Sequence, residues 1–473
     1  MGRTKVGQMA LCFSFIIMGF IATAALLLDF NKPHYYDVLF LMPLVFSLLS
    51  FVFYQIYFLI PSNLGVSLIV CLSFWRMVIT PLFMSLGDYS VVLQYNLSAN
   101  TDKAVFLICY EMMAIFIALY VLCRRSNKQK DGSVVLRGNA KISKIYVLLL
   151  IFILVILAFC ISTTPELLEG YRTVFEISEQ FFVNHEDAYI VEQYGKDFIS
   201  KLSLVLGQYF MRAAVIIVPA FLIILLLRKQ SVSPVAKILS FLMCLLPLFF
   251  IGGAIARSLI YCVELFLLRS YMTPSKRTNK RMAFLILVAA VLVIIWWLFR
   301  LDVNGGVDNV FAYFSETFNS YFSGVNIVSG VFNMPNDFEI KLHYFIYDYI
   351  GSVPFGNTLF GLTGDRIQPF FNAFNGTTGQ IPTTIGMGYY YFGYLLAPLY
   401  SILFACIAFK ASEKVQQCNT QTPVRYIRLL VMIFSFSMGI IMYNIEILFT
   451  NVFSLILPMY IMERISYKKE VHE

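Results

Sequence analysis

The sequence predicts an all-α polytopic membrane protein with about 12 transmembrane helices and a large helical loop on the outer side. Apolar residues make up 59% of the 473 residues and charged residues only 13%, whereas a soluble protein carries about 25% charged residues. Long apolar segments alternate with loops of contrasting charge. Lipid is the solvent that suits such a surface, and no Gly-rich phosphate loop or nucleotide-binding domain is present.

Each predicted span is an apolar segment near the length of about 20 residues that crosses the hydrocarbon core. The segments are 8–28, 38–60, 63–83, 103–123, 145–162, 202–227, 237–253, 254–270, 282–299, 386–408, 426–446 and 448–465. Two short neighbours meet at Gly252 and Gly253, which favours a tight hairpin or a re-entrant pair. The first span follows a short head without a small-residue cleavage site, which is typical of a signal anchor that is retained.

The distribution of charge predicts the orientation. Basic residues concentrate in loops such as 124–144 and 269–281, whereas the loop 162–201 is acidic. Because cytosolic loops carry the excess of Lys and Arg, we expect both termini in the cytosol. The net charge of +8 is then a topological feature, and it does not indicate nucleic-acid binding. The nine Cys form no CxxC pair, so neither a disulfide framework nor a zinc site is expected.

This topology divides the chain into a membrane domain over 1–299, a large outer loop over 300–385, and a last group of spans with a cytosolic tail over 386–473. A connection as long as the outer loop is usually functional. Its first part places Phe311 and Phe318 among aromatic residues at helical spacing. That pattern favours a helix lying on the membrane surface, with rings that stack on sugars as the alternative.

Ionisable residues within or at the edges of the spans are the next feature. They are Arg76, Glu111, Arg212, Arg257, Glu264 and Glu446. Each costs about 2.5–3.5 kcal/mol at mid-span, so each needs a partner or a water-filled cavity. For Arg76 and Glu111 we favour a structural pair that ties two helices together. Arg212 lies in the middle of its span.

Arginines near the outer surface are candidates for phosphate or pyrophosphate binding, because the planar guanidinium makes bidentate hydrogen bonds and stays charged. Arg257 lies at the outer end of the short hairpin and Arg300 ends its span at the same level. Snorkelling anchors are the alternative for both. Arg366 in the long loop is a further candidate.

General-base candidates also lie in the long loop. His343 is the only His there, and its side chain can titrate near neutral pH. Asp348 and Asp365 are the alternatives.

Two segments resemble the Wzy family of O-antigen and capsular-polysaccharide repeat-unit polymerases. IPTTIGMGYYYFGYLL (381–396) is similar to the family's P-S-x-x-G-E-x-Y-x-N-F-G-x-x-G segment. The matching residues are Pro382, Gly386, Tyr389, Phe392 and Gly393. GGAIARSLIYCVELFLL (252–268) is similar to an S-R-S/G segment that O-antigen ligases share. The chain departs from the family at Met387, where Glu is common, and at Tyr391, where Asn is common.

The resemblance implies a GT-C-type glycosyltransferase in the bacterial cytoplasmic membrane. It would join undecaprenyl-pyrophosphate-linked oligosaccharide repeat units on the outer face, in O-antigen or capsule biosynthesis, and it would need no cofactor or metal. Its partners would be membrane lipid, a chain-length regulator and a flippase. Arg257, Arg300 and Arg366 would then hold the pyrophosphate, with Arg212 lining the cavity. His343 or Asp365 would act as the base, beside Arg366.

Other functions fit parts of the sequence. A flippase or exporter of lipid-linked oligosaccharide also needs many spans, but transporters tend to show repeated halves with broken helices, and no such symmetry is visible here. An O-antigen ligase would share the segment around Arg257. A scaffold membrane protein would not need an arginine at mid-span.

Overall fold

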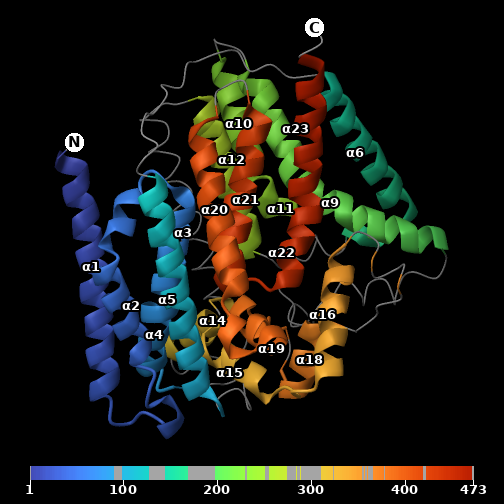
Figure 1. Cartoon of the computed structure of the whole chain (residues 1–473). Helices are drawn as coiled ribbons and strands as arrows, with labels where there is room; N and C mark the ends of the chain where they lie inside the picture. The colour runs from blue at the N-terminus through green and yellow to red at the C-terminus, as the bar shows by residue number, and fades with distance from the viewer. Residues whose placement is uncertain are drawn as a thin grey trace. The chain divides into compact units, whose positions relative to one another are not determined.

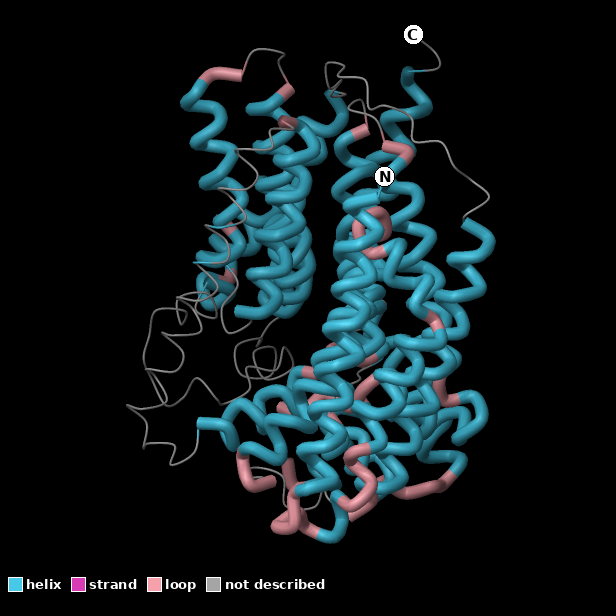
Figure 2. Tube along the Cα trace, turned by 90° about the vertical axis from the view of Figure 1, so that its left-hand side faces the viewer, coloured by secondary structure: helices cyan, strands magenta, loops and turns pink. Residues whose placement is uncertain are grey.

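A computed structural model describes most of the chain. The described residues are 2–89, 99–126, 144–168, 198–228, 232–250, 255–273, 284, 288, 310–322, 324–353, 356, 360, 366–377, 379–418 and 422–470. Every regular element that these residues form is a helix, as Figure 2 shows. The predicted all-α class is thereby confirmed for this part of the chain.

Seven helices in the described part are long and apolar enough to cross a membrane. They are Val6–Leu28, His34–Val52, Leu64–Leu86, Thr101–Arg125, Leu202–Leu227, Pro423–Ile441 and Ile445–Arg464. A bent pair, Thr384–Leu396 with Leu399–Gln416, makes an eighth if it is counted as one span. Val147–Thr163 and Pro234–Leu245 are shorter apolar helices. The protein is therefore a polytopic membrane protein by length and composition of its helices, and the count of about 12 stays a prediction.

The described chain forms two compact units. Unit 1 comprises Met1–Gly132, Val307–Glu413 and Met432–Thr450. Unit 2 comprises Ser133–Gly306, Lys414–Val431 and Asn451–Glu473. Unit 1 thus joins the first helices of the chain to the helices of the long loop and to part of the helices that follow it. The expected division into membrane domain, outer loop and last spans concerns the sides of a membrane and stays a prediction.

The first helices of unit 1 pack around aromatic side chains. In order they are α1 (Gly2–Leu28), η1 (His34–Tyr36), α2 (Leu41–Val52), η2 (Tyr54–Leu59), α3 (Leu64–Phe74), the π-helical turn η3 (Trp75–Ile79), α4 (Thr80–Leu86) and α5 (Thr101–Ser126). Phe15 of α1 stacks on Phe74 of α3 with ring centroids 4.3 Å apart. Phe46 of α2 meets Phe116 of α5 edge to face at 6.0 Å. These rings form a core that binds α1, α2, α3 and α5 together, because each buries a large apolar area.

The described part of the long loop adds four further helices to unit 1. They are α14 (Val310–Tyr321), α15 (Val325–Asn333), α16 (Phe338–Ser352) and α18 (Ile367–Asn375). The predicted helix with an aromatic stripe is α14, and part of its stripe packs against the early helices, whereas Phe311 and Tyr321 are 45% and 48% exposed. Phe318 meets Trp75 of η3 at 5.0 Å and Phe83 of α4 at 5.2 Å. The stripe therefore anchors the long loop to the early spans, because a packed aromatic pair gains contact energy that an exposed ring lacks.

Amide side chains fasten α15 and α18 to each other. Asn375 donates to the carbonyl oxygen of Gly330 at 3.2 Å, and Asn333 donates to Asn375 Oδ1 at 3.0 Å. Asn100, just before α5, donates to Asn333 Oδ1 at 2.9 Å. Gly376 has φ of +66° and ends α18, since glycine adopts the left-handed region without a steric penalty. This network holds the loop helices that carry the site described below.

The expected span 386–408 is two helices rather than one. They are α19 (Thr384–Leu396) and α20 (Leu399–Gln416), and they meet at 108°. Gly393 has φ of +76° inside α19, a value that side chains with a Cβ rarely adopt. The bend also brings Gly388 so close to the carbonyl of Ala397 that a Cβ would lie 2.1 Å from its oxygen. Glycine is required at both positions.

Later helices contribute to both units. They are α21 (Pro423–Ile441), α22 (Ile445–Asn451), the π-helical turn η6 (Val452–Ile456) and α23 (Leu457–Glu470). Unit 2 also contains α6 (Lys144–Thr163), η4 (Pro165–Leu168), α9 (Phe198–Leu227), α10 (Pro234–Leu245), α11 (Pro247–Phe250) and α12 (Ile255–Met272), labelled in Figure 1. Within unit 2, Tyr271 stacks on Tyr426 at 3.9 Å, and Arg428 pairs with Glu463 at 2.7 Å. The predicted hairpin at Gly252 and Gly253 and the predicted span 282–299, apart from two of its residues, lie outside the described residues.

Candidate functional site

A buried carboxyl group forms the centre of the candidate site. Asp348 lies on α16 and is 1% exposed. Its Oδ2 accepts a hydrogen bond from the hydroxyl of Tyr391 on α19 at 2.6 Å. Its Oδ1 accepts from the backbone N–H of Ile367, the first residue of α18, at 3.1 Å. One carboxyl group thereby joins three helices, and it satisfies a backbone donor that the start of a helix leaves without an intrahelical partner.

Burial changes the acidity of this group. Desolvation disfavours the charged form and raises the pKa of Asp348 to about 6, against the opposing effects of the hydrogen bonds from Tyr391 and Ile367 and of the charge on Arg366. A carboxyl with a pKa near 6 is still mostly ionised at neutral pH, yet it holds a proton far better than an exposed aspartate. This is the acidity that suits a general base.

An arginine–glutamate pair lies beside the carboxyl. Arg366, at the residue before α18, forms an ion pair with Glu446 of α22, and its Nη2 donates to the carbonyl oxygen of Gly351 at 3.1 Å. The two charged side chains are 21% and 11% exposed. Ser352 of α16 donates to the carbonyl oxygen of Asp348 at 2.6 Å and to that of Glu446 at 3.4 Å. These contacts join the end of α16 to the starts of α18 and α22. The groups at their centre are the carboxyls of Asp348 and Glu446 and the guanidinium of Arg366.

Aromatic side chains surround the polar groups. The hydroxyls of Tyr349 and Tyr400 hydrogen-bond to each other. Phe345 of α16 meets Tyr391 at 5.3 Å, and Tyr349 meets Phe449 of α22 at 5.1 Å, both edge to face. Such rings exclude water from one side of the carboxyl, and this is the physical origin of its raised pKa.

The structure places His343 and Arg366 on or next to the helices of the site. His343 is a partly exposed residue of α16, and its ring stacks on that of Tyr347 at 4.1 Å. Arg366 directly precedes Ile367, whose N–H donates to Asp348, and its side chain reaches the carbonyl oxygen of Gly351 at the end of α16. Asp365 and Arg300 lie outside the described residues. Asp348, the third candidate base, contacts Tyr391 in the segment 381–396.

The other two predicted arginines belong to unit 2. Arg212 lies on α9 and Arg257 on α12, where Arg257 is partly exposed. The contacts described around Asp348 lie within unit 1. A role for Arg212 and Arg257 in binding pyrophosphate therefore stays a prediction.

The residues that carry the family resemblance line the same part of unit 1. Gly386 is buried, and a Cβ there would lie 2.8 Å from Cγ2 of Val331 on α15. Tyr389 packs against Phe332 at 4.4 Å, and Phe392 packs against Phe345 at 5.8 Å. Pro382 is buried just before α19, and Gly393 makes the bend in that helix. These residues shape and position α19, and the hydroxyl that reaches Asp348 comes from Tyr391, where the chain departs from the family.

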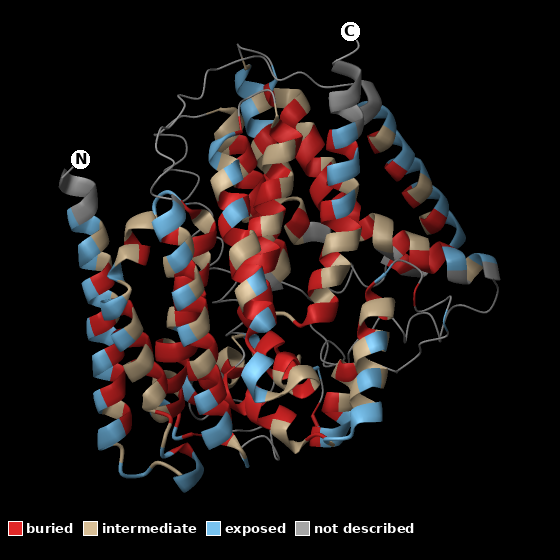
Figure 3. Cartoon of the chain, viewed as in Figure 1, coloured by how far each residue is buried: buried red, intermediate tan, exposed pale blue. Residues whose placement is uncertain are grey.

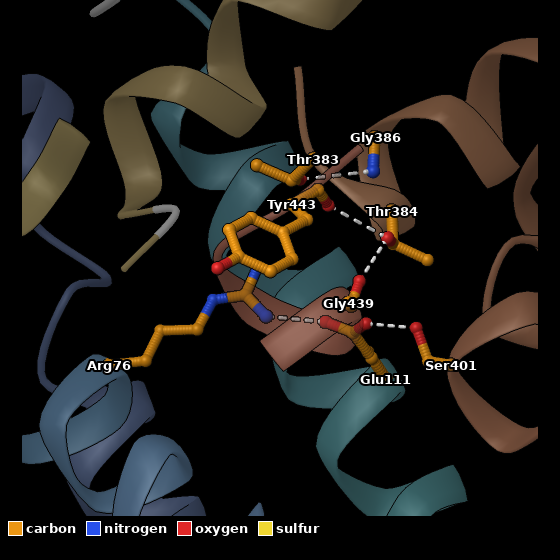
Figure 4. A network of polar contacts seen from close by, with 8 residues as sticks. All are labelled: Arg76, Glu111, Thr383, Thr384, Gly386, Ser401, Gly439 and Tyr443. Carbon is orange, nitrogen blue, oxygen red and sulfur yellow. Dashed lines mark hydrogen bonds and ion pairs between the residues drawn. The ribbon is translucent and has the colours of Figure 1, made fainter. Parts of the chain in front are cut away.

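A second polar centre in unit 1 is fully closed. Arg76 Nη1 and Glu111 Oε2 are 2.6 Å apart, and neither side chain is exposed. Ser401 of α20 donates to the other oxygen of Glu111, so Arg76 and Ser401 approach it from opposite sides in Figure 4. The predicted pairing of Arg76 with Glu111 is confirmed. It joins η3, α5 and α20, and a buried charge pair of this kind is stable only when its lone pairs are also satisfied.

The start of α19 is fastened next to this centre. Thr383 accepts a hydrogen bond from the N–H of Gly386 at 3.4 Å and caps the helix. Thr384 donates to the carbonyl oxygens of Gly439 and Tyr443, the second at 3.1 Å. Carbonyls at the end of a helix need such donors, so Thr384 links the start of α19 to the end of α21.

Sequence reasoning missed two partners in the site. Glu446 was recognised as an ionisable residue of a span, but its partner Arg366 lies in the long loop, which no periodicity connects to that span. The contact of Tyr391 with Asp348 was also missed. The sequence feature that points to this contact is the Tyr at position 391, where the family's segment commonly has Asn.

Among the described residues, no group of three or more His, Cys, Asp or Glu side chains is placed to hold a metal ion. Comparisons of the chain with known protein families, with curated proteins and with solved structures find no match.

Proposed function

We propose that the protein is a polysaccharide polymerase that joins undecaprenyl-pyrophosphate-linked repeat units on the outer face of the bacterial cytoplasmic membrane. The resemblance of segments 381–396 and 252–268 to the Wzy polymerases supports this function. The observation that carries it is the hydrogen bond between Tyr391, in the first of these segments, and the buried carboxyl of Asp348. The segment that resembles the family is thus in direct contact with a carboxyl that has the acidity of a general base.

In the proposed reaction the non-reducing-end hydroxyl of the incoming repeat unit attacks the anomeric carbon of the growing glycan. The new bond forms between that oxygen and the anomeric carbon, and the bond from the anomeric carbon to the pyrophosphate oxygen breaks. Undecaprenyl pyrophosphate leaves with the electron pair. The hydroxyl proton passes to Tyr391, whose own proton passes to Oδ2 of Asp348 along the 2.6 Å hydrogen bond. The broken phosphoglycosyl bond supplies the free energy.

Arg366 is the cation that we assign to the leaving pyrophosphate. Negative charge grows on the pyrophosphate as the glycosidic bond forms, and a fixed guanidinium stabilises such charge most strongly where water is scarce. In the absence of substrate Arg366 pairs with Glu446. The pyrophosphate would replace this carboxylate, because both present oxygens that accept from the same planar fork.

The experiment uses the purified protein in nanodiscs with lipid-linked repeat units from its own host. We expect a ladder of glycan lengths from the parent protein, and no ladder from the Asp348→Asn variant. Asparagine keeps the size of the side chain and the acceptor for the N–H of Ile367, so the variant should remain folded. The Glu339→Gln variant is the matched control, because Glu339 is an exposed carboxyl on the same helix.

Three results would overturn the proposal or its assignment of Asp348 as the base. The first is a full ladder from Asp348→Asn. The second is transport of intact units across proteoliposome membranes without any ladder, which would indicate a flippase. Transfer of finished glycan to a different acceptor, without extension, would instead indicate a ligase.

A further inference from the structure

The helix that carries Asp348 has an apolar stripe on its exposed side. Phe338, Leu342 and Ile346 of α16 follow one another at intervals of four residues, so they lie on one side of the helix. They are 75%, 44% and 42% exposed. Val353, immediately after the helix, is exposed as well. Large apolar side chains that gather on one surface indicate a contact with something other than water.

Two polar residues of α16 lie on its inner side. Asp348 and Ser352 are both almost completely buried. A helix on a water-soluble protein turns its apolar stripe inward and its polar residues outward. α16 departs from this arrangement, because it buries the carboxyl of Asp348 and exposes Phe338, Leu342 and Ile346 beyond the exposed Glu339 of its first turn. The exposed stripe therefore indicates an apolar medium along this part of the helix.

The neighbours of α16 support the same conclusion. Its residues Phe345 and Tyr349 pack against Phe392 of α19 and Tyr400 of α20. The α19–α20 pair is a membrane-span candidate, and exposed leucines lie on both sides of its bend. They include Leu395, Leu396, Leu399 and Leu403. In Figure 3 both α16 and the α19–α20 pair include residues coloured as exposed.

We propose that acyl chains of the bilayer cover the stripe Phe338–Leu342–Ile346, so that α16 is a lipid-embedded helix of partial depth. Its 15 residues extend over about 22 Å, which is less than the about 30 Å of the hydrocarbon core. The helix therefore enters the lipid layer without crossing it. This inference concerns lipid contact and does not depend on the proposed enzymatic activity.

The test is photo-cross-linking in nanodiscs of phosphatidylglycerol and phosphatidylethanolamine. Benzoylphenylalanine is placed, in separate proteins, at Leu342 and at Ile346, and the adducts are identified by mass spectrometry. We expect phospholipid adducts at both positions, at a yield within about threefold of that at Leu403, an exposed position in the α19–α20 pair. The negative control is Asn31, an exposed residue in the loop after α1, where we expect at least tenfold less adduct.

Three outcomes would overturn the inference. The first is adduct formation at Leu403 without adducts at Leu342 and Ile346. The second is a cross-link from either position to another segment of the same chain, and the third is a cross-link to a second copy. The reaction requires no substrate, so a failed polymerase assay leaves this result unchanged, and a failed cross-link leaves the polymerase assay unchanged.

Discussion

Unit 1 contains two arginine–glutamate pairs that differ in their surroundings. Arg76 and Glu111 have no exposed surface, and a serine hydroxyl satisfies the second carboxylate oxygen. Arg366 and Glu446 retain 21% and 11% exposure and lie beside a titratable carboxyl. The first pair therefore has no room to exchange a partner, whereas the second pair has an open side. The same two residue types build a structural joint in one place and a candidate binding site in the other.

The largest effect is expected from breaking the fully buried Arg76–Glu111 pair. The Arg76→Met variant leaves the charge of Glu111 buried without its partner, so we expect the free energy of unfolding to fall by about 3–5 kcal/mol. The measurement is the thermal unfolding midpoint in detergent, followed by intrinsic fluorescence. Lys410→Met, an exposed position on α20, is the control and should change little.

A double variant sharpens this prediction. Replacing Glu111 with Met in addition to Arg76→Met removes the orphaned charge, so most of the lost stability should return. Equal instability of the single and double variants would show that packing rather than charge dominates this centre.

The next effect concerns pH and Asp348. The pKa of this group is about 6 in the folded protein and near 3.8 when exposed, so the folded state binds the proton more tightly than the unfolded state does. Its contribution to stability is therefore present at low pH and is lost as the pH rises from about 4 to about 6. Asp348→Asn lacks this dependence. We expect it to be more stable than the parent by about 1–3 kcal/mol above pH 7.

The two proteins should converge near pH 4. The measurement is the difference between their unfolding midpoints at several pH values. A difference that does not vary with pH would mean that the carboxyl has an ordinary acidity.

A smaller effect is expected from Tyr391→Phe. This change removes the hydroxyl that joins α19 to Asp348 and retains the ring that packs against Phe345. If the hydroxyl relays the proton, the turnover number should fall by about 10–100-fold, with little change in the midpoint of unfolding. An unaltered turnover number in the ladder assay would assign Tyr391 to structure alone.

The smallest effect is expected from removing the negative charge of the Arg366–Glu446 pair. Glu446→Gln keeps a hydrogen-bond acceptor near Arg366 but removes the negative charge, so the cost to stability should be about 1 kcal/mol. The guanidinium of Arg366 should bind a phosphate more tightly, because the carboxylate of Glu446 no longer competes for it. Titration with inorganic pyrophosphate, followed by the shift in unfolding temperature, measures this gain. A larger shift for the parent than for the variant would contradict the proposed exchange.

Much of the fold was predictable, because lipid imposes a composition and a length on every span. The apolar segments at 8–28, 103–123 and 202–227 correspond to α1, α5 and α9. The bend between α19 and α20 was not predictable from hydropathy, since the apolar run continues through it. The left-handed backbone of Gly393 adds a kink inside α19, and a glycine alone does not specify its own φ.

The site was predictable in its residue types but not in its pairing. The buried Arg76 and Glu111 lie in neighbouring spans, so the cost of an unpaired charge in lipid was enough to join them. Arg366 and Asp348 lie in a loop that is free of that constraint. Their partners Glu446 and Tyr391 are fixed by the packing of α16, α18 and α19, and packing between distant segments leaves no periodic trace in the sequence.

The sequence positions of the partners of Glu111 determine the order in which its contacts can form during biosynthesis. Arg76 precedes Glu111 by 35 residues, whereas Ser401 follows it by 290 residues. At about 5–20 residues per second, a ribosome needs roughly 15–60 s to travel from Glu111 to Ser401. The ion pair is therefore available to the nascent chain long before its third member has been translated. Glu446 lies 94 residues after Ser352, so the Arg366–Glu446 pair can form only near the end of synthesis. The Arg76–Glu111 pair therefore forms before the candidate binding site during assembly in the membrane.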